Sequence, residues 1–442
     1  MSEGIFCIRV YGCQMNAYDG DRLRSAMTEL GWEESSDAFA SDAVIFVTCS
    51  IRDKAEQKVI SELGRFRPMW EKDKKPKVAL LGCMAQRTGA DIAGKFPWVR
   101  VVAGPRHLGL VPRSIAESMN GGVFMHLDGD AGEKMDLECA PVPKVNPHKA
   151  FITIAHGCDQ FCSYCIVPYV RGRFASRPPE GVLAEANRLV NRGILEITLL
   201  GQNVNSYGKD FDGDAGNYRF ASLLRDVAAI KGLRRLRFTT SHPLDFSDDI
   251  LDAMKSCPNI CPGINLPVQA GSDKVLREMN RKYTRDQYID AVKKIREALP
   301  EVGLTTDLIV GFPGESEEDF EESVSLIEET RFALVHSAAY SPRLGTPAAK
   351  REDQIPDAVR SMRLARINEL QSRISHEINH EHVGRVMEVL LDDAAPKGKG
   401  LLQGRTVTDK VVLVKASAEM TGRFRSVKIT GASPWCLEGR LL

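Results

Sequence analysis

Short apolar runs alternate with longer amphipathic stretches over the first 120 residues. The runs at 6–10, 43–47 and 78–81 contain four or five residues each and are rich in branched and aromatic side chains, as buried strands are. The stretches at 19–30 and 53–66 have the length and periodicity of helices. Strands that alternate with helices predict a small parallel sheet with helices on its faces.

The alternation restarts on a larger scale after residue 150. Further strands are predicted at 196–200, 235–239, 263–267, 304–310 and 334–340. Helices are predicted at 182–192, which Gly193 ends, at 284–299, where Thr284 and Gln287 form a capping box, and after the N-cap Ser316. Five or six strand–helix units in a row predict a full or partial parallel barrel. A long charged helix at 357–380 leaves this domain.

The last sixty residues have a different pattern. VMEVLLDD, KVVLVKA and SVKITGA are short β-prone runs between turns rich in Gly, Pro and Lys, which predicts a small antiparallel barrel. Prolines and glycines between residues 120 and 149 indicate a linker. We therefore expect an N-terminal domain at 1–120, a linker at 121–143, a barrel at 144–377 and a terminal domain at 378–442.

The composition limits the class of protein. A chain of 442 residues exceeds what one hydrophobic core supports, and its formal net charge is zero. The sequence has no basic stretch followed by a long apolar run and no 18 uninterrupted apolar residues, so we expect a cytoplasmic protein without a membrane span. Eleven cysteines, an odd number, then indicate metal or redox chemistry rather than a disulfide framework.

Three cysteines stand close together in HGCDQFCSYC. Cys158, Cys162 and Cys165 have a C-x3-C-x2-C spacing, so their thiolates can reach three irons of one cubane cluster. Protein sites usually supply four cysteines, and three leave one iron free to bind a substrate or cosubstrate. Two alternatives remain open, namely a zinc site that would use His156 and a set of structural or dithiol cysteines.

Three further cysteines each follow one of the N-terminal strands. Cys13, Cys49 and Cys83 occur in YGCQMN, VTCSIR and LGCMAQR. Because parallel strands end at the same edge of a sheet, the fold would bring these thiols together as a second three-thiolate site. The alternative is that they are small buried residues at strand ends, where free cysteine is common.

The central spacing resembles the signature of the radical S-adenosylmethionine (SAM) superfamily. The resemblance implies a [4Fe-4S] cluster whose open iron binds the methionine part of SAM, and whose electron releases a 5′-deoxyadenosyl radical. The segment DLIVGFPGE, residues 307–315, corresponds to the segment that lines the adenine pocket in that superfamily. Glycines there let the backbone approach a flat ligand closely, although an ordinary strand-to-helix turn gives the same pattern.

The whole chain resembles the methylthiotransferase family. YGCQMN, TCSIRDKAEQK, GCMAQR, the central cysteine loop, INLPVQAGSD, MNRKYTRDQY, DLIVGFPGE and YSPRLGTPAA match it in order and spacing. The family fold implied is α/β, with a flavodoxin-like parallel N-terminal domain, a partial parallel (β/α) radical SAM barrel and a small C-terminal β-barrel called TRAM. The implied cofactors are SAM and two [4Fe-4S] clusters, one on each cysteine triplet.

Within the family, the chain is most similar to the bacterial group that methylthiolates carbon 2 of N6-isopentenyladenosine beside the anticodon of tRNA. One SAM would methylate a sulfur at the N-terminal cluster, and a second would give the radical. The partners implied are the anticodon loop and a reductase such as flavodoxin or ferredoxin. The sulfur donor is unknown, and we expect a monomer.

Other side chains are candidates for the same site. By resemblance and position at strand ends, those expected to bind the cofactor are Tyr164, Gln202, His242, Gln269, Asp307, Gly311, Pro313 and Gly314. Those expected to contact the substrate are Arg171, Arg173, Arg423 and Arg425. The cysteines expected to take no part are Cys7, Cys139, Cys257, Cys261 and Cys436.

The terminal domain bears on the substrate class. From His380 onward ten Lys and Arg stand against seven Asp and Glu, a net charge of +3, and Arg423-Phe424-Arg425 pairs charge with an aromatic ring. This composition suits phosphates and loop bases, although a solvated barrel face would have it too. Relatives that modify threonylcarbamoyladenosine in tRNA or an aspartate of a ribosomal protein remain alternatives, as does a non-enzymatic iron–sulfur or zinc module that binds RNA.

Overall fold

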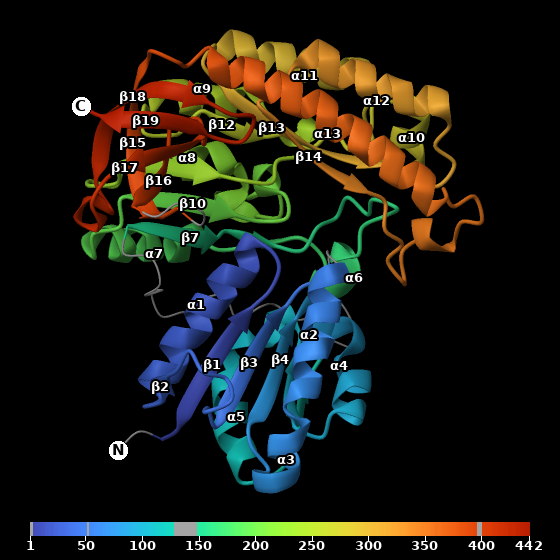
Figure 1. The fold of residues 1–442 in the computed structure, drawn as a ribbon, viewed down its shortest axis with the longest axis vertical. Helices are drawn as coiled ribbons and strands as arrows, with labels where there is room; N and C mark the ends of the chain where they lie inside the picture. The colour runs from blue at the N-terminus through green and yellow to red at the C-terminus, as the bar shows by residue number, and fades with distance from the viewer. Residues whose placement is uncertain (1–2, 51–52, 128–147, 396–399) are drawn as a thin grey trace.

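The computed structural model describes residues 3–50, 53–127, 148–395 and 400–442. It has three parts, an N-terminal α/β unit, a larger α/β barrel above it and a small β-barrel at one side of the larger one (Figure 1). The predicted fold class is confirmed in all three parts. Within the described residues no helix is both long enough and apolar enough to cross a membrane.

The N-terminal unit is built on one parallel sheet with the strand order β2-β1-β3-β4-β5-β6. Its strands are β1 (Ile5–Val10), β2 (Glu33–Glu34), β3 (Ala43–Thr48), β4 (Lys77–Gly82), β5 (Val99–Ala103) and β6 (Phe124–His126). The three strands predicted from the sequence, β1, β3 and β4, are parallel neighbours as expected. Strand β6 lies in the range predicted as linker, and the predicted residues 128–143 of that linker, with Cys139, fall outside the described residues.

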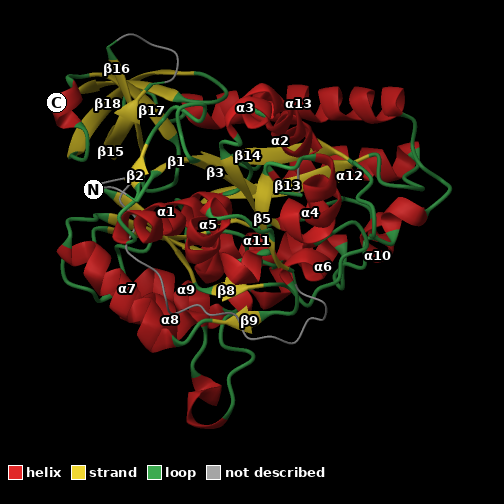
Figure 2. Ribbon diagram, turned by 90° about the horizontal axis from the view of Figure 1, so that it is seen from below, coloured by secondary structure: helices red, strands yellow, loops and turns green. Residues whose placement is uncertain are grey.

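Helices cover both faces of this sheet (Figures 1 and 2). They are α1 (Gln14–Glu29), α2 (Asp53–Arg65), α3 (Arg67–Asp73), α4 (Cys83–Lys95), η1 (Pro105–Leu110) and α5 (Val111–Met119). Leu23 of α1 and Ile115 of α5 belong to the core on one face, and Leu63 of α2 and Ile92 of α4 belong to the core on the other. Helix α1 begins five residues before its predicted start, directly after Cys13.

The large barrel has six parallel strands in the described residues. They are β7 (Lys149–Thr153), β10 (Glu196–Leu200), β11 (Arg235–Phe238), β12 (Gly263–Asn265), β13 (Gly303–Val310) and β14 (Leu334–Ala339). Strands β7, β10 and β11 form one sheet and β12 to β14 another, and a parallel bridge between Leu236 and Ile260 links them. No pairing joins β7 to β14 in this part of the chain, so the barrel is partial.

Helices alternate with these strands. They are α6 (Val167–Arg171), α7 (Pro179–Asn191), α8 (Phe220–Ala228), α9 (Asp248–Ser256), α10 (Asp273–Glu278), α11 (Arg285–Ala298) and α12 (Glu317–Thr330), with the short elements β8 (Ala155–His156), β9 (Ala175–Ser176), η2 (Val204–Ser206), η3 (Gly213–Asn217), η4 (Pro243–Asp245) and η5 (Ala348–Lys350). Both predicted N-caps are confirmed, because Thr284 and Ser316 each form a capping box. Helix α13 (Asp357–His380) has its predicted bounds and packs along β14 toward the small barrel (Figure 1).

The C-terminal unit is a closed barrel with the strand order β15-β16-β17-β19-β18. Its elements are β15 (Val386–Ala394), β16 (Leu401–Arg405), β17 (Val411–Lys415), η6 (Ala418–Met420), β18 (Phe424–Ala432) and β19 (Leu437–Leu441). The pair β17 and β19 is parallel, and the other neighbours are antiparallel as expected.

Two buried arginines of β11 fasten this unit to the large barrel. Arg235 donates to the carbonyl oxygens of Arg405 and Glu388, at 2.8 and 3.0 Å. Arg237 donates to those of Val407 and Thr406, at 3.0 and 2.7 Å.

Candidate functional site

The N-terminal cysteines lie at the carboxyl edge of the first sheet. Cys13 is the N-cap of α1, Cys49 follows β3, and Cys83 is the first residue of α4. Gly12 has φ +117°, and a Cβ there would lie 2.3 Å from the Cβ of Cys49, so the loops after β1 and β3 are in contact. A hydrogen bond from the Cys49 thiol lowers the pKa of Cys13 to about 5, against the effect of burial.

Asn16 connects these loops, although the sequence patterns did not single it out. Its amide donates to the carbonyl oxygens of Tyr11 and Thr48 at 2.7 and 2.8 Å. Its Oδ1 accepts from the Cys13 thiol at 3.4 Å and from Arg171 at 3.3 Å. The side chain is 1% exposed. Asn16 therefore holds the ends of β1 and β3 and one thiol in a fixed relation.

Arg171 joins the two cysteine triplets. It is the last residue of α6, the helix after the central cysteine loop, yet its Nε donates to Cys83 Sγ at 3.3 Å. Cys83 also packs against Ile166 and Val170 of the same segment. Arg171 is 3% exposed and contacts Met15, Asn16 and Asp19 besides Cys83, and its contact with substrate stays a prediction.

The central cysteines lie on the loop between β8 and α6. The amide of Cys158 donates to Gly172 O at 3.2 Å and that of Cys165 to Cys162 O at 3.0 Å, which closes the loop. Burial raises the pKa of Cys158 to about 11 and that of Cys165 to about 12. Thiolates in such surroundings need cationic or metal partners, and Arg281 Nη1 supplies one at 3.5 Å from Cys162 Sγ.

Both donor sets consist of thiols, the ligands that iron–sulfur clusters take. In residues 3–50, 53–127, 148–395 and 400–442, no three His, Cys, Asp or Glu side chains are arranged to hold one metal ion. Cysteines that ligate a cubane each bind a different iron, so they stand further apart than the ligands of one ion. Each triplet offers three thiols on adjoining or compact loops, which fits an iron–sulfur cluster.

Buried polar atoms without hydrogen-bond partners gather at the carboxyl ends of β10 and β11. They include Gln202 Oε1, both polar atoms of the Asn205 amide, Ser241 Oγ and His242 Nδ1. Buried polar groups are normally satisfied, so a polar ligand such as SAM fits this end of the barrel. Of these residues the sequence prediction included Gln202 and His242. Asn205 and Ser241 were missed, although QNVN and TTSHP follow predicted strands.

The other candidates for cofactor binding are partly or fully buried. His242 is 5% exposed, its ring meets Tyr283 edge-on at 5.8 Å, and burial lowers the pKa of His242 to about 3. Tyr164 is half-buried, and burial holds the pKa of its hydroxyl well above its usual value. Burial also raises the pKa of Asp307, which accepts from Asn265 at 3.1 Å.

Gln269 and the glycine turn lie at the ends of β12 and β13. The backbone amide of Gln269 donates to Asp307 O at 2.8 Å. Pro313 is buried, and Gly311 and Gly314 have φ +71° and +76°. A Cβ on Gly311 would lie 2.4 Å from Arg360, and one on Gly314 would lie 2.6 Å from Arg351. Protein side chains thus occupy the space beside both glycines, and their ligand contact stays a prediction.

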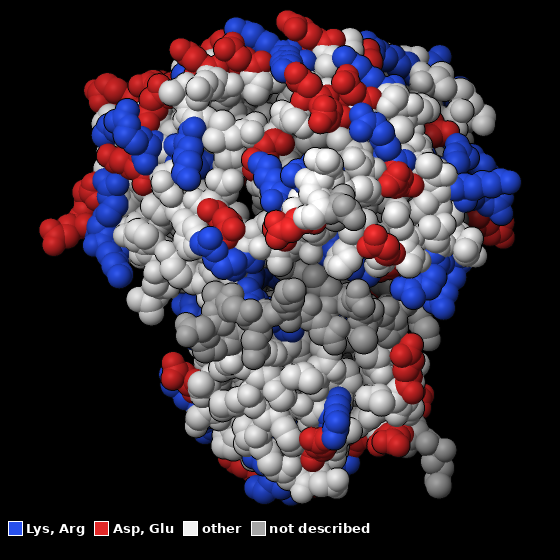
Figure 3. All heavy atoms as spheres, turned by 180° about the vertical axis from the view of Figure 1, so that it is seen from behind, with Lys and Arg blue, Asp and Glu red and all other residues white. Residues whose placement is uncertain are grey.

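The remaining predicted arginines lie at the surface or on the small barrel. The side chain of Arg173 is 60% exposed, pairs with Asp159 at 3.1 Å and covers the Phe161 ring. Arg423 is exposed, whereas Arg425 is half-buried and donates to Phe424 O at 3.0 Å. The Phe424 ring lies against the guanidinium groups of Arg234 and Arg235, 4.5 and 4.7 Å from its centroid. That aromatic ring therefore packs between domains. On the described part of the face in Figure 3, basic and acidic side chains are interspersed.

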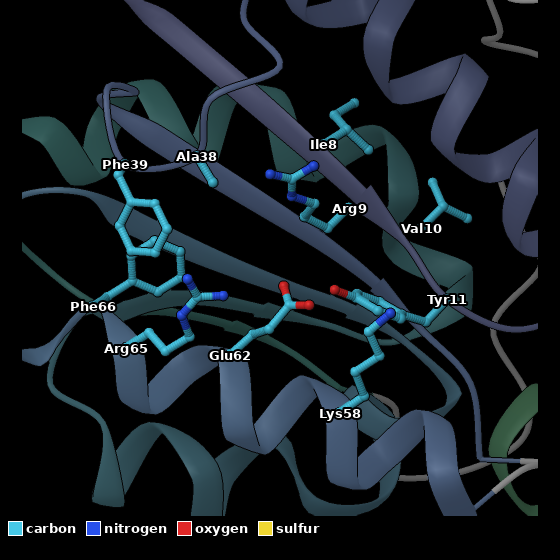
Figure 4. A pocket seen from close by; sticks show the side chains of 10 residues that line it. All are labelled: Ile8, Arg9, Val10, Tyr11, Ala38, Phe39, Lys58, Glu62, Arg65 and Phe66. Carbon is cyan, nitrogen blue, oxygen red and sulfur yellow. The ribbon is translucent and has the colours of Figure 1, made fainter.

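A separate cavity of about 370 Å³ lies beside β1 and α2. Figure 4 shows Tyr11, Lys58 and Glu62 converging on one end, with Arg65, Phe39 and Phe66 at the other. None of the predicted site residues lines it.

Sequence relatives cover the whole chain. Models of the uncharacterized protein family UPF0004, the radical SAM superfamily and the TRAM domain match residues 5–104, 152–327 and 381–442. A protein of Acetivibrio thermocellus named tRNA-2-methylthio-N(6)-dimethylallyladenosine synthase is 42% identical over 99% of this chain and 91% of its own. A protein of the same name from Clostridium perfringens is 41% identical over 100% and 98%. The chain belongs to the radical SAM methylthiotransferase family. The predicted family is thus confirmed, and SAM and one [4Fe-4S] cluster are the cofactors of radical SAM enzymes.

Solved structures agree with this fold. The radical SAM methyltransferase TsrM from Kitasatospora setae, with cobalamin and a [4Fe-4S] cluster bound, has a TM-score of 0.53 at 15% identity and covers 91% of this chain and 81% of its own. The cobalamin-dependent SAM radical enzyme OxsB, with aqua-cobalamin and SAM bound, has a TM-score of 0.54 at 11% identity, over 83% and 56%. At these identities the likeness concerns the fold alone.

Proposed function

We propose that this enzyme methylthiolates carbon 2 of N6-isopentenyladenosine next to the anticodon in tRNA, with two molecules of SAM and two [4Fe-4S] clusters. The observation that carries the proposal is the identity of 40–42% over nearly the full length of relatives named tRNA-2-methylthio-N(6)-dimethylallyladenosine synthase. The presence of a TRAM domain supports a nucleic-acid substrate. A cytoplasmic monomer that receives electrons from a flavodoxin or ferredoxin is part of the same proposal.

The two triplets would hold the two clusters. Cys158, Cys162 and Cys165 would ligate the cluster that binds SAM, and Cys13, Cys49 and Cys83 would ligate the second. When bound, the clusters and SAM would supply a methylated sulfur and the radical that removes hydrogen from carbon 2. An aromatic C–H bond of this kind has no acidic proton, so a general base cannot start the reaction, and radical chemistry accounts for the need of these cofactors.

The residues of the chain would orient the reactants and exclude water. Contacts of Arg171 and Ile166 with Cys83 keep the two loops together, which supports a shared cavity between the triplets. The unpartnered polar atoms of Gln202, Ser241 and His242 would bind the polar groups of SAM. A buried, neutral His242 can accept or donate a hydrogen bond there without adding charge.

The substrate is tested by mass spectrometry of tRNA nucleosides from a strain that lacks the gene. Loss of methylthio-isopentenyladenosine, restored by the intact gene, is expected. Loss of methylthio-threonylcarbamoyladenosine, or of methylthio-aspartate in a ribosomal protein, with unchanged isopentenyladenosine derivatives would reject the proposal in favour of one of the two alternatives.

The clusters are tested by anaerobic reconstitution and iron counting. We expect about eight irons per chain, and about four after Ala replaces either triplet. The matched control is the double variant Cys257→Ala, Cys261→Ala, because these cysteines also have a C-x3-C spacing but stand outside both triplets. Bound zinc without iron, or equal losses in the control, would contradict the assignment of the ligands.

A further inference from the structure

At each cysteine triplet, a buried arginine donates a hydrogen bond to a thiol. Arg171 donates to Cys83 at 3.3 Å, and Arg281 donates to Cys162 at 3.5 Å. The two arginines are 3% and 9% exposed. A buried guanidinium costs free energy unless it is paired with an anion and hydrogen-bonded, so two such groups on two sulfurs call for a physical explanation.

The partners of Arg171 come from the other domain. Besides Cys83, its guanidinium contacts Asn16 at 3.3 Å and Asp19 at 3.9 Å. In return Arg106 of η1 donates to the carbonyl oxygen of Arg171 at 3.3 Å, and a Cβ on Gly172 would lie 1.6 Å from Arg106. The backbone and the side chain of Arg171 are thus both fixed, and its charge is held at the N-terminal triplet.

Arg281 is fixed in the same way inside the barrel. Its Nη2 donates to Pro267 O at 2.9 Å and its Nε to the hydroxyl of Tyr283 at 2.8 Å. Its guanidinium also lies 5.0 Å from the centroid of the Tyr283 ring. These neutral partners leave the positive charge of Arg281 to be balanced by the central thiolates. No comparable contact links Arg281 to Cys13, Cys49 or Cys83 in the described residues.

We propose that Arg171 and Arg281 are positioning residues that set the reduction potentials of the two cluster sites separately. The inference rests on the proposed function, because it requires a cluster on each triplet. A site with thiolate ligands gains one negative charge when it takes up an electron. A fixed guanidinium in low-dielectric surroundings stabilises that reduced state, and hydrogen bonds to the sulfurs act in the same direction.

The test isolates one cluster at a time. In a chain with Ala at positions 158, 162 and 165, only the N-terminal cluster remains, and the variants Arg171→Met, Arg171→Gln and Arg171→Lys are compared there. In a chain with Ala at positions 13, 49 and 83, the same replacements are made at Arg281. Each protein is titrated with dithionite at a series of fixed potentials, and the reduced cluster is quantified by electron paramagnetic resonance together with the iron content.

We expect Met or Gln at either position to lower the ratio of reduced to oxidised cluster about tenfold at fixed potential, a shift of about 59 mV for one electron. Lys, which keeps the charge, should retain most of the parental ratio. In the chain with both clusters, Arg171→Met should shift the N-terminal signal alone, and Arg281→Met the central signal alone. If the Met variants bind no cluster, the ratios of reduced to oxidised cluster in the Gln and Lys variants are compared instead.

Two results would overturn the inference. Unchanged ratios in variants that carry a full complement of iron would show that the arginines serve packing alone, and equal shifts with Gln and Lys would show that charge is not the cause. Failure of the proposed function would be seen in the unsubstituted chain, which would then bind no iron or would not modify tRNA.

Discussion

Replacement of Arg237 by Met should loosen the C-terminal barrel from the rest of the chain. The guanidinium is 8% exposed, donates to the carbonyl oxygens of Val407 and Thr406, and lies 3.1 Å from Glu196. Hydrogen bonds to charged groups contribute about 1.5–3 kcal/mol each, and both carbonyl partners belong to the C-terminal barrel, whereas Glu196 belongs to the large barrel. We therefore expect the barrel to detach more easily by about 3 kcal/mol or more.

Arg234 offers a matched control on the neighbouring residue. It also contacts the C-terminal barrel, through Glu388 at 3.2 Å and the Phe424 ring, but its side chain is 54% exposed. Exposed ion pairs contribute at most about 1 kcal/mol, so Arg234→Met should have a small effect.

Hydrogen exchange of the amides in β16 and β17 measures both variants. Because each 1.4 kcal/mol changes an equilibrium constant tenfold, Arg237→Met should speed exchange of these amides by on the order of 100-fold, and Arg234→Met by less than about tenfold. Exchange that is equal in the two variants, or that spreads evenly over the N-terminal sheet, would refute the argument that Arg237 fastens this barrel.

Three further predictions concern other contacts. Tyr18→Phe removes a hydroxyl that donates to Glu185 at 3.0 Å across the domain interface, so the free energy of unfolding in urea should fall by about 1–2 kcal/mol. The control Tyr169→Phe, at an exposed ring, should leave the free energy of unfolding unchanged. Gly12→Ala would place a methyl group 2.3 Å from Cys49 Cβ, at a residue whose φ is +117°. The iron content should therefore fall from about eight to about four per chain. The control Gly94→Ala, which has open space around it, should keep all its iron. Burial lowers the pKa of Lys410 from 10.5 to about 8, so the contribution of Lys410 to stability is present above pH 10.5 and is lost as the pH falls to 8. Relative to the Lys410→Met variant, the free energy of unfolding should therefore rise by up to about 3 kcal/mol between pH 7 and 10.5. Parallel curves of unfolding free energy against pH for the two proteins would contradict this.

The sequence predicted several strands and helices from local patterns, although it missed β5, whose VRVVA run is as apolar as those of the predicted strands. Helix α13 and strand β10 have their predicted bounds, because Pro356 precedes the helix and Gly193 and Gly201 flank the strand. Strands β16 and β19 were missed, because LLQGR and LEGRL are short, contain glycine and acquire their pairing from distant strands. Helix α1 was predicted too short, since its N-cap is a cysteine rather than a Ser, Thr, Asp or Asn.

The candidate site, like the fold, could be predicted from the sequence only in part. Spacing within one loop and the position after parallel strands were enough to single out both cysteine triplets. The contacts of Arg171 with Cys83 and Asn16 span 88 and 155 residues of sequence, so no local pattern signals them. The packing of Phe424 against Arg234 and Arg235 likewise depends on domain assembly, so no local pattern signals it. The nucleic-acid contact expected of Arg423 and Arg425 stays a prediction.

The way in which the first two domains meet follows from their strand direction. In α/β units, ligands bind at the carboxyl ends of parallel strands, and here those edges of both units lie at one interface. Buried contacts hold them there: Tyr18 of α1 with Glu185 of α7, Met15 with Gln202, and Arg171 with Cys83. The two binding edges therefore face each other across this interface. An enclosed site suits radical chemistry, since water and stray hydrogen atoms would otherwise consume the radical. Tyr18 also belongs to a small buried cluster with Met15 and Leu200 against which Cys13 packs, so Tyr18→Phe should weaken the alignment of the two triplets as well.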